Sequence, residues 1–222
     1  MALEFPVDRA ALLLVELQND MVHESNIGQK GLGGTLAPRV HERQVLQKTA
    51  RVLEAARPRG VPVLYVNMCA KPGFPRPPAP IYRRLARGKQ ALVEGTWGAE
   101  VHQLVAPRPE DFVLCRTVSF DGSYGTQLYP VVRMLGRTTL VVLGISTNFA
   151  VEGIVRASVN RGFEVVVVED CCASISAEMH DWSIRNIMPV LATVTSSDEL
   201  LAHLANSPLK KSGPSQRGER RA

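Results

Sequence analysis

The feature that most constrains the fold is a series of six short apolar runs separated by segments that favour helices. Each run is four to six residues long and mostly apolar, which is typical of strands buried on both faces of a parallel sheet. The runs are Ala10–Val15, Val61–Val66, Phe112–Cys115, Thr139–Leu143, Phe163–Val168 and Leu191–Thr195. This alternation predicts an α/β fold, a three-layer α-β-α sandwich with a six-stranded, mostly parallel sheet.

Helical patterns account for most of the segments between these runs. The predicted helices are Pro38–Arg57, Thr126–Gly136, Val151–Arg161, Ser176–Val190 and Leu200–Ala205. Ser196 and Glu199 have capping-box spacing before the last one. Four glycines between Val22 and Thr35 predict an irregular loop. Clustered prolines in Lys71–Gly98 predict a long loop, and such loops are more often functional than idle.

Length and charge favour one soluble domain with a short tail. The chain has 222 residues, and we expect one domain over residues 1–206. Ser207–Ala222 carries five basic and one acidic side chain, a net +4, which leaves +1 of the total +5 for the domain. We therefore expect a disordered basic tail and no binding of nucleic acid. No apolar run approaches the roughly 20 residues that span a bilayer, so we expect no membrane contact and a cytoplasmic location.

The cysteines and histidines give no sign of a metal site. No CxxC pair occurs, and Cys171 and Cys172 are adjacent, so we expect the four cysteines to be reduced and mostly buried. The five histidines are scattered along the chain, and no ligand spacing implies a metal. The sequence has no GxGxxG or P-loop pattern, so it predicts no nucleotide or other cofactor.

One stretch, Gly144–Gly153, has the character of a site. It begins where the run Thr139–Leu143 ends, and it continues into a helix-compatible segment. A turn from a buried strand into a helix directs backbone N–H groups to one place, which suits an anion or a developing oxyanion. The first residue of the helix is the position where a nucleophile would be most useful. In this chain it is Ala150.

Polar residues stand at the ends of other predicted strands. Glu16, Asn67, Arg116 and Asp170 each lie at or just past such an end. The carboxyl ends of parallel strands share one edge of the sheet, where α/β proteins bind ligands. We therefore expect these side chains to gather near Gly144–Ala150.

Four segments together resemble the isochorismatase-like superfamily, which includes the cysteine hydrolases nicotinamidase and N-carbamoylsarcosine amidohydrolase. They are Leu13–Asp20, Tyr124–Leu128, Gly144–Gly153 and Gly162–Asp170. The resemblance covers about Ala10–Thr195. It implies a six-stranded, mostly parallel sheet flanked by helices, and a homo-oligomer (dimer or tetramer) by analogy with the family.

The resemblance also implies where catalytic residues belong. The amidohydrolases of this family use an Asp, a Lys and a Cys, and these positions fall on Glu16, Arg116 and Ala150. Counting back from Gly125–Thr126 without a gap gives Thr117 instead of Arg116. In the family the peptide before Ser146 is cis, so that the N–H groups of Ser146 and Ala150 converge. All three catalytic positions differ from the family's, and a methyl group closes the covalent thiol route.

Members without the cysteine offer another route, because isochorismatases cleave a vinyl ether by acid-assisted hydrolysis. Glu16 would then be the acid or base and Arg116 a clamp for an acidic substrate; the alternatives are a structural carboxylate and an ion-pairing arginine. The further candidates for substrate binding are Ser146, Asn148, Phe149, Trp97 and Gln18. Asn148 could equally cap its helix, Trp97 could lie at the core edge, and Gln18 could brace a turn.

Three functions remain compatible with these residues. The first is a hydrolase that acts on a small, acidic molecule by acid–base chemistry without a thiol. The second is a catalytically silent member that binds a small molecule or serves in assembly. The third is a cysteine amidohydrolase whose nucleophile has been replaced by Ala150, naturally or by engineering.

Overall fold

A computed structural model of the chain describes residues 3–73, 80 and 91–209. Six strands form one sheet in the order β3-β2-β1-β4-β5-β6, and every neighbouring pair is parallel. The strands are β1 Ala10–Val15, β2 Val63–Met68, β3 Phe112–Arg116, β4 Thr139–Ile145, β5 Glu164–Ala173 and β6 Thr193–Thr195. The predicted six-stranded α/β fold is therefore confirmed, with a fully parallel sheet.

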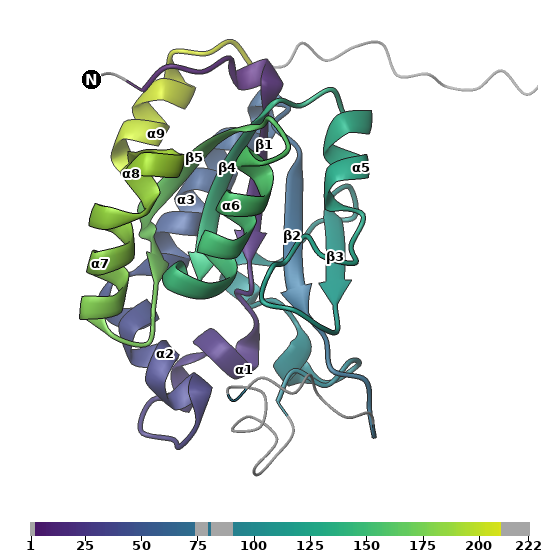
Figure 1. Ribbon diagram of the computed structural model, residues 1–222, viewed down its shortest axis with the longest axis vertical. Helices are drawn as coiled ribbons and strands as arrows, with labels where there is room; N and C mark the ends of the chain where they lie inside the picture. The colour runs from purple at the N-terminus through teal and green to yellow at the C-terminus, as the bar shows by residue number, and fades with distance from the viewer. Residues whose placement is uncertain (1–2, 74–79, 81–90, 210–222) are drawn as a thin grey trace, which may run out of the picture.

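Helices cover both faces of this sheet (Figure 1). They are α1 Asn19–Val22, α2 Leu32–Glu42, α3 Val45–Ala56, α5 Leu128–Met134, α6 Glu152–Val159, α7 Ala177–Asn186, α8 Met188–Leu191 and α9 Ser197–Ala205. Figure 1 shows α6 in front of the strands and α3 behind them. The strands point toward the end of the molecule where α1 and α2 lie, so the carboxyl edge of the sheet faces these two helices.

The core explains why the strand sequences are apolar. Every residue of β1, β2 and β4 is buried, as expected for strands with helices on both sides. Edge strand β3 instead alternates between partly buried and exposed residues until Arg116, which is buried. The sheet therefore carries a charged side chain into the interior at its carboxyl edge.

Two predicted helical boundaries are wrong. The helix expected over Pro38–Arg57 is broken into α2 and α3 by Gln44, whose φ of 54° is left-handed. The loop expected over Val22–Thr35 contains the start of α2. Gly34 is needed there because a Cβ on it would lie 1.9 Å from the Gln29 carbonyl oxygen, so glycine marks close packing at this position instead of a loop.

The strand predicted to end at Val168 continues to Ala173. A register shift between Val142 and Gly144 of β4 lets the second half of β5 pair with the end of β4.

Asp170 was expected at the site but lies within this strand. Its carboxylate accepts hydrogen bonds from the N–H (2.6 Å) and hydroxyl (2.7 Å) of Ser197. Asp170 therefore anchors α9 instead of joining the site.

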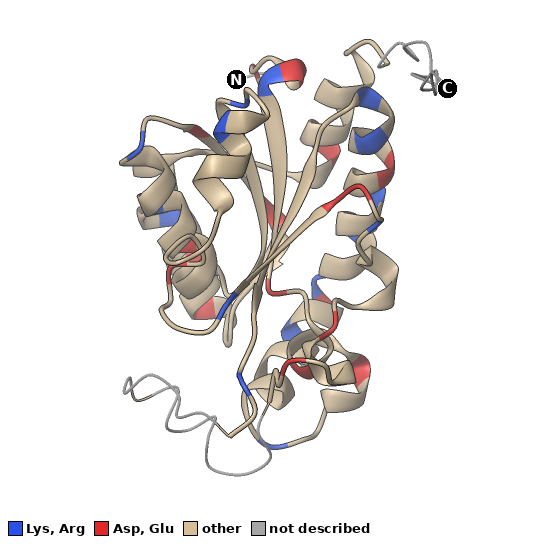
Figure 2. Cartoon of the chain, turned by 90° about the vertical axis from the view of Figure 1, so that its right-hand side faces the viewer, with Lys and Arg blue, Asp and Glu red and all other residues tan. Residues whose placement is uncertain are grey.

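The outer surface carries charges of both signs. No helix in the described ranges is both long and apolar enough to span a bilayer. In the view of Figure 2, basic and acidic residues are interspersed along the outer helices. The predicted tail lies outside the described residues from 210 onward, as do residues 74–79 and 81–90 of the predicted long loop.

Candidate functional site

Glu16 leaves the end of β1 in an unusual backbone conformation. Its φ is 54°, in the left-handed region that a residue with a long side chain rarely adopts. Its N–H still donates to the Val66 carbonyl of the neighbouring strand at 3.0 Å, so the sheet holds the residue in place. Only 5% of Glu16 is exposed. Backbone strain of this kind tends to occur at functional sites.

Arg116, the last residue of β3, forms an ion pair with Glu16 through Nη2. Its Nε donates to the Ser119 carbonyl at 3.1 Å, and Ser119 also has a left-handed φ, 77°. Arg116 is only 3% exposed, and within the part of the chain that the structure describes its Nη1 has no hydrogen-bond partner. Thr117, the alternative position, is exposed. This unused donor is itself buried, so an acid can reach it only after the groups that cover it move aside.

The loop after β3 packs over the start of α6. The rings of Phe120 and Phe149 are 5.9 Å apart between centroids. A Cβ on Gly122 would lie 2.6 Å from a methyl of Val66 and 2.8 Å from one of Ile154. This close approach fixes the loop that follows Arg116 between β2 and α6.

That turn has the backbone the resemblance implies. The Ile145–Ser146 peptide is cis, as expected, and Thr147–Val151 then forms one π-helical turn before α6. The N–H groups of Phe149 and Val151 donate to the Ser146 carbonyl at 3.0 and 3.2 Å, so these two amides are already used. Ala150 is 2% exposed. The role of the Ser146 and Ala150 amides in binding an anion stays a prediction.

Gly144 brings this turn next to Glu16. The register pairs Gly144 with Val15, the residue before Glu16. Its φ is 123°, and a Cβ there would lie 2.2 Å from the Val15 carbonyl oxygen. Only glycine allows β4 to approach β1 this closely at the carboxyl edge.

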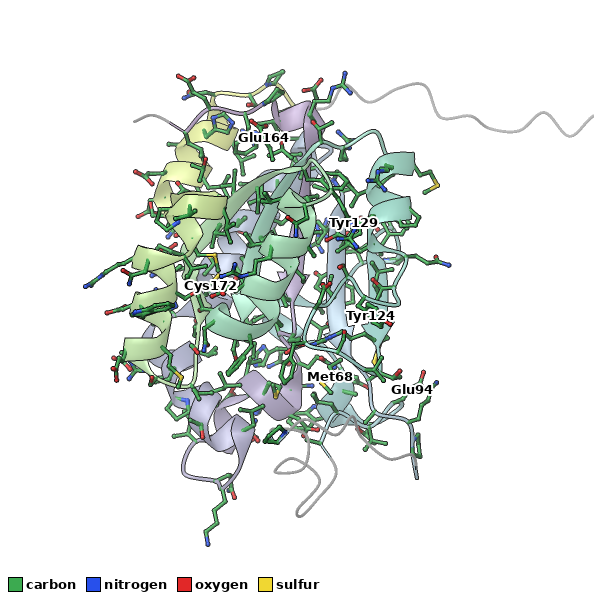
Figure 3. The ribbon with its side chains drawn as sticks, in the orientation of Figure 1. Met68, Glu94, Tyr124, Tyr129, Glu164 and Cys172 are labelled. Atoms are coloured by element: carbon green, nitrogen blue, oxygen red, sulfur yellow. A yellow bond between two sulfur atoms is a disulfide. The ribbon has the colours of Figure 1, made fainter. Side chains whose placement is uncertain are left out.

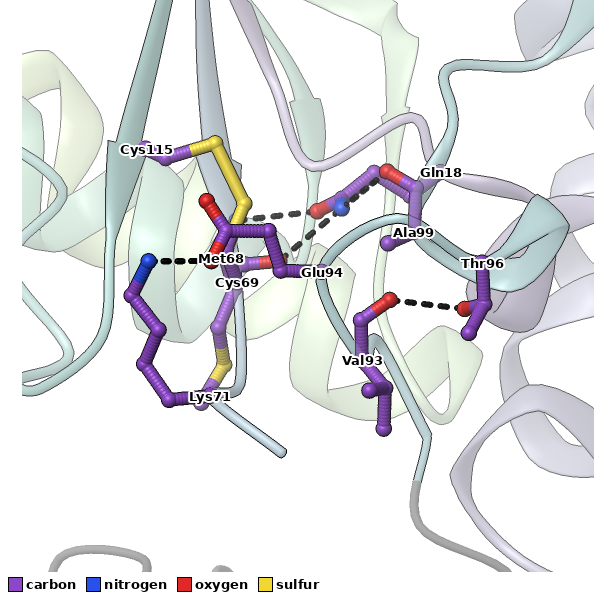
Figure 4. Close-up of a disulfide and its surroundings, with 9 residues drawn as sticks. All are labelled: Gln18, Met68, Cys69, Lys71, Val93, Glu94, Thr96, Ala99 and Cys115. Atoms are coloured by element: carbon purple, nitrogen blue, oxygen red, sulfur yellow. Dashed lines mark hydrogen bonds and ion pairs between the residues drawn. A yellow bond between two sulfur atoms is a disulfide. The ribbon is translucent and has the colours of Figure 1, made fainter. Parts of the chain in front are cut away.

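Gln18 braces the backbone instead of facing a substrate (Figure 4). Its Nε2 donates to the carbonyls of Met68 (2.9 Å) and Ala99 (2.7 Å), and its Oε1 accepts from the Met68 N–H at 2.9 Å. Both amide hydrogens are thus used, and the residue is fully buried. Gln18 therefore has no free N–H with which to bind a substrate, which supports the interpretation that it braces the backbone.

Two other candidates have their own partners. Asn148 accepts a hydrogen bond from the Ser174 hydroxyl and does not cap its helix. The Trp97 ring, 52% exposed, packs edge-on against His23 at 4.8 Å between centroids, so it is not a buried core residue. Substrate binding by Asn148, Trp97, Phe149 or Ser146 stays a prediction.

The expectation of four reduced cysteines is wrong for two of them. Cys69 follows β2, Cys115 lies in β3, and a disulfide joins them across the two strands with their Cα atoms 5.7 Å apart (Figure 4). Their separation of 46 residues hid this pairing in the sequence. Together with Asn67 they line a cavity of about 420 Å³. Cys115 and Arg116 are adjacent in a strand, so this cavity lies on the opposite face of the sheet from Arg116.

The remaining thiols, Cys171 and Cys172, are free and fully buried. Burial raises the pKa of both thiols well above the usual range, which keeps them protonated and unreactive. The register pairs Cys172 with Gly144 of β4, and Figure 3 shows it apart from Met68 and Glu94. Neither thiol is therefore suited to act as a nucleophile.

One group among the described residues has metal-type ligand atoms close together. Atoms of His23, Glu24 and His102 lie within 4.8 Å of one another. However, Nδ1 of His23 accepts from the Ser25 N–H at 3.1 Å, and Nδ1 of His102 accepts from the Leu104 N–H at 3.2 Å. Each neutral ring therefore carries its proton on Nε2, facing Glu24. A metal would need the opposite tautomer, so we assign none here.

Sequence reasoning missed a polar network behind the turn. The Thr147 hydroxyl lies 2.8 Å from His180 Nδ1, and His180 Nε2 lies 3.5 Å from the Glu169 carboxylate. Nothing in the sequence marked His180 among five scattered histidines. Only the packing of α7 against the turn brings these residues together.

The fold is that of an isochorismatase-like α/β domain. The chain matches the family model described as Isochorismatase domain over residues 10–199, and it belongs to that family. It is similar in fold to a cysteine hydrolase from Pseudomonas syringae, with a TM-score of 0.78, 21% identity and coverage of 90% of this chain and 94% of that one.

Several sequence relatives carry functional names. Ureidoacrylate amidohydrolase RutB of Methylobacterium radiotolerans is 29% identical over 157 residues, which cover 64% of this chain and 60% of that protein. This chain thus matches less than two thirds of that relative's length. A probable inactive nicotinamidase of Arabidopsis thaliana is 27% identical over 182 residues, with coverage of 80% and 87%.

Proposed function

We propose that the chain is a hydrolase that acts on a small, acidic molecule by acid–base chemistry without a thiol. The observation that carries the proposal is the buried Glu16–Arg116 pair with Arg116 Nη1 left open. Arg116 Nη1 binds the acidic group of the substrate once the groups that cover it move aside, and Glu16 moves the proton. The N–H groups of Ser146 and Ala150 stabilise the negative charge that develops on the reacting oxygen.

Contact with a guanidinium also selects between the two proton-transfer roles of Glu16. The ion-paired Glu16 carboxylate takes a proton from the attacking water and passes it on to the leaving amine. Water activated in this way attacks a carbonyl carbon, as in amides and ureides. A vinyl ether would require the opposite role, so an amide-like bond fits the pair better than the bond cleaved by isochorismatases.

The test is a panel of isochorismate, ureidoacrylate and nicotinamide offered to the purified protein and to Glu16→Gln. We expect turnover of an amide-like compound, and a loss of about 10²–10⁴-fold in kcat in the variant. A matched control is Glu164→Gln, because Glu164 is hydrogen-bonded to Thr139 at the opposite end of the sheet (Figure 3). Unchanged kcat in Glu16→Gln would remove Glu16 from the mechanism, and turnover of isochorismate alone would assign it the acid role.

A second candidate is a catalytically silent member that binds a small molecule or serves in assembly. The relative named as a probable inactive nicotinamidase and the changes at all three catalytic positions favour it. Thermal-shift measurements with the same panel separate the two, because binding without turnover would favour the silent member. Amidase activity gained by Ala150→Cys would instead favour a replaced nucleophile.

Location and assembly belong to the same proposal. We infer a cytoplasmic homo-oligomer by analogy with the family. Light scattering of the purified protein at the mass of a single 24.3 kDa chain would overturn the oligomer.

A further inference from the structure

A buried hydroxyl stands at the start of the turn that carries Ala150. Thr147 is the first residue of the π-helical turn after the cis peptide, and none of it is exposed. Its Oγ1 lies 2.8 Å from Nδ1 of His180, which is 2% exposed on α7. Neither group can exchange its partner for water without opening the structure, so this contact belongs to the folded state.

The far side of the imidazole decides the direction of this hydrogen bond. His180 Nε2 lies 3.5 Å from Oε2 of Glu169, and a carboxylate oxygen accepts, so Nε2 carries the proton. Nδ1 then has a free lone pair and Thr147 donates its hydroxyl proton. The hydrogen bond from His180 is the largest cause that lowers the pKa of Glu169, and the charge of Arg43 adds to it against the effect of burial.

Arg43 fixes Glu169 from the other side. Its Nη2 donates to the Glu169 carboxylate at 2.8 Å and to the Glu169 carbonyl at 3.1 Å, and its Nε donates to the Cys172 carbonyl at 2.9 Å. Glu169 and Arg43 are only partly buried, with side-chain exposures of 34% and 26%. The network thus runs from solvent through His180 to the buried hydroxyl.

Two more side chains, one in the turn and one at the start of α6, form hydrogen bonds with the segment after β5 and with α7. Asn148 accepts from the Ser174 hydroxyl of the segment after β5. Glu152 accepts from the Ser183 hydroxyl of α7 at 2.7 Å. The turn and the first residue of α6 are therefore attached to α7 and to the segment after β5 at three points, and Thr147 supplies the one nearest the cis peptide.

The order hydroxyl, imidazole, carboxylate is also that of nucleophilic triads. Thr147 cannot act in that way, because its side chain has no exposed surface and a substrate carbon could not reach it. In this position the hydroxyl forms a hydrogen bond with His180, and this bond holds the surrounding backbone in place.

We propose that His180 is a positioning residue: by accepting the Thr147 hydroxyl proton, with Glu169 fixing its tautomer, it holds the turn whose Ser146 and Ala150 N–H groups form the anion site. The importance of the turn for catalysis rests on the proposed function. The geometric part does not, because it can be measured in the protein without substrate.

The first measurement is the tautomer of His180 in the ¹⁵N-labelled full chain by long-range ¹H–¹⁵N NMR. We expect a proton on Nε2 and an unprotonated Nδ1 at neutral pH. A proton on Nδ1 would overturn the proposal, whether or not the protein is an enzyme.

The second measurement is amide hydrogen exchange at Ser146 and Ala150 in a set of variants. In the nearly isosteric Thr147→Val we expect exchange about fivefold faster or more, as for one lost hydrogen bond. His180→Leu should match it, whereas His180→Asn, whose Oδ1 can stand where Nδ1 stood, should restore most of the protection.

The matched control is His203→Leu, since His203 is hydrogen-bonded to the Phe5 carbonyl at 2.9 Å in another part of the fold. It should leave exchange at the turn unchanged. Unaltered exchange in Thr147→Val, or equal exchange in His180→Asn and His180→Leu, would contradict the positioning role. If His180→Leu does not fold, the tautomer and Thr147→Val still decide the question.

Discussion

The two halves of the sheet's carboxyl edge are built by different means. On the β1–β3 side, Glu16 and Arg116 place opposite charges in direct contact inside the protein. On the β4–β5 side, the groups next to the turn are a hydroxyl and an imidazole, and the charges of Glu169 and Arg43 stay near the surface. One half supplies charge and the other supplies backbone geometry. Ala150 adds no nucleophile to either half.

The largest expected effect tests the β1–β3 side of the carboxyl edge, which holds the Glu16–Arg116 pair. Arg116→Ala leaves the Glu16 carboxylate buried without its partner, and such a loss costs about 3–5 kcal/mol of unfolding free energy. Urea unfolding of the variant and the wild type measures it. A loss below about 1 kcal/mol would mean that the pair is solvated, which would undermine the contrast between the two halves.

The next effect tests the junction between the halves. Gly144→Ala combines a left-handed φ of 123° with a Cβ 2.2 Å from the Val15 carbonyl oxygen, and we expect a loss of about 2–4 kcal/mol. Gly162 provides a matched control, because its φ is 80° but nothing lies within 4 Å of an added Cβ. Gly162→Ala should cost only about 1–2 kcal/mol. Equal losses in the two variants would show that the close approach of β4 to β1 is unimportant.

A smaller, pH-dependent effect tests the β4–β5 side of the carboxyl edge. The pKa of Glu169 lies below its ordinary value of 4.5, first because of the hydrogen bond from His180. The carboxylate therefore contributes stability above pH 4.5, and that contribution is lost as the pH falls through the lowered pKa. Glu169→Gln should flatten this part of the stability profile, measured by thermal unfolding below pH 5. An unchanged profile would remove Glu169 from the network.

The sequence predicted the strands and the charged pair because both leave local signals. Apolar runs mark buried strands, and Glu16 and Arg116 stand where those runs end. It also predicted the cis peptide at Ile145–Ser146 through the resemblance. The extension of β5 was missed because Glu169 and Asp170 look like the end of a strand until a register shift in β4 is known.

Other features depend on contacts between distant segments. The Cys69–Cys115 disulfide joins residues 46 positions apart, and the contact of Thr147 with His180 joins residues 33 apart. Neither has a spacing that a single sequence reveals. The break between α2 and α3 rests on the left-handed φ of Gln44, which side-chain periodicity does not report.

The last of these expectations concerns the free thiols. Burial raises the pKa of Cys171 and Cys172, so at pH 8 both remain protonated in the folded protein. Under non-reducing conditions, labelling by a disulfide reagent should be at least about a hundredfold slower than in urea-unfolded protein. Rapid labelling of either thiol without unfolding would show that sulfur is accessible after all.

The most direct test of the central claim, hydrolysis without sulfur, is the kcat of a variant with all four cysteines changed to alanine, on the compound that the panel identifies. The account predicts a kcat within about threefold of the wild type, because no thiol takes part in the reaction. Loss of turnover in the folded, cysteine-free protein would contradict it.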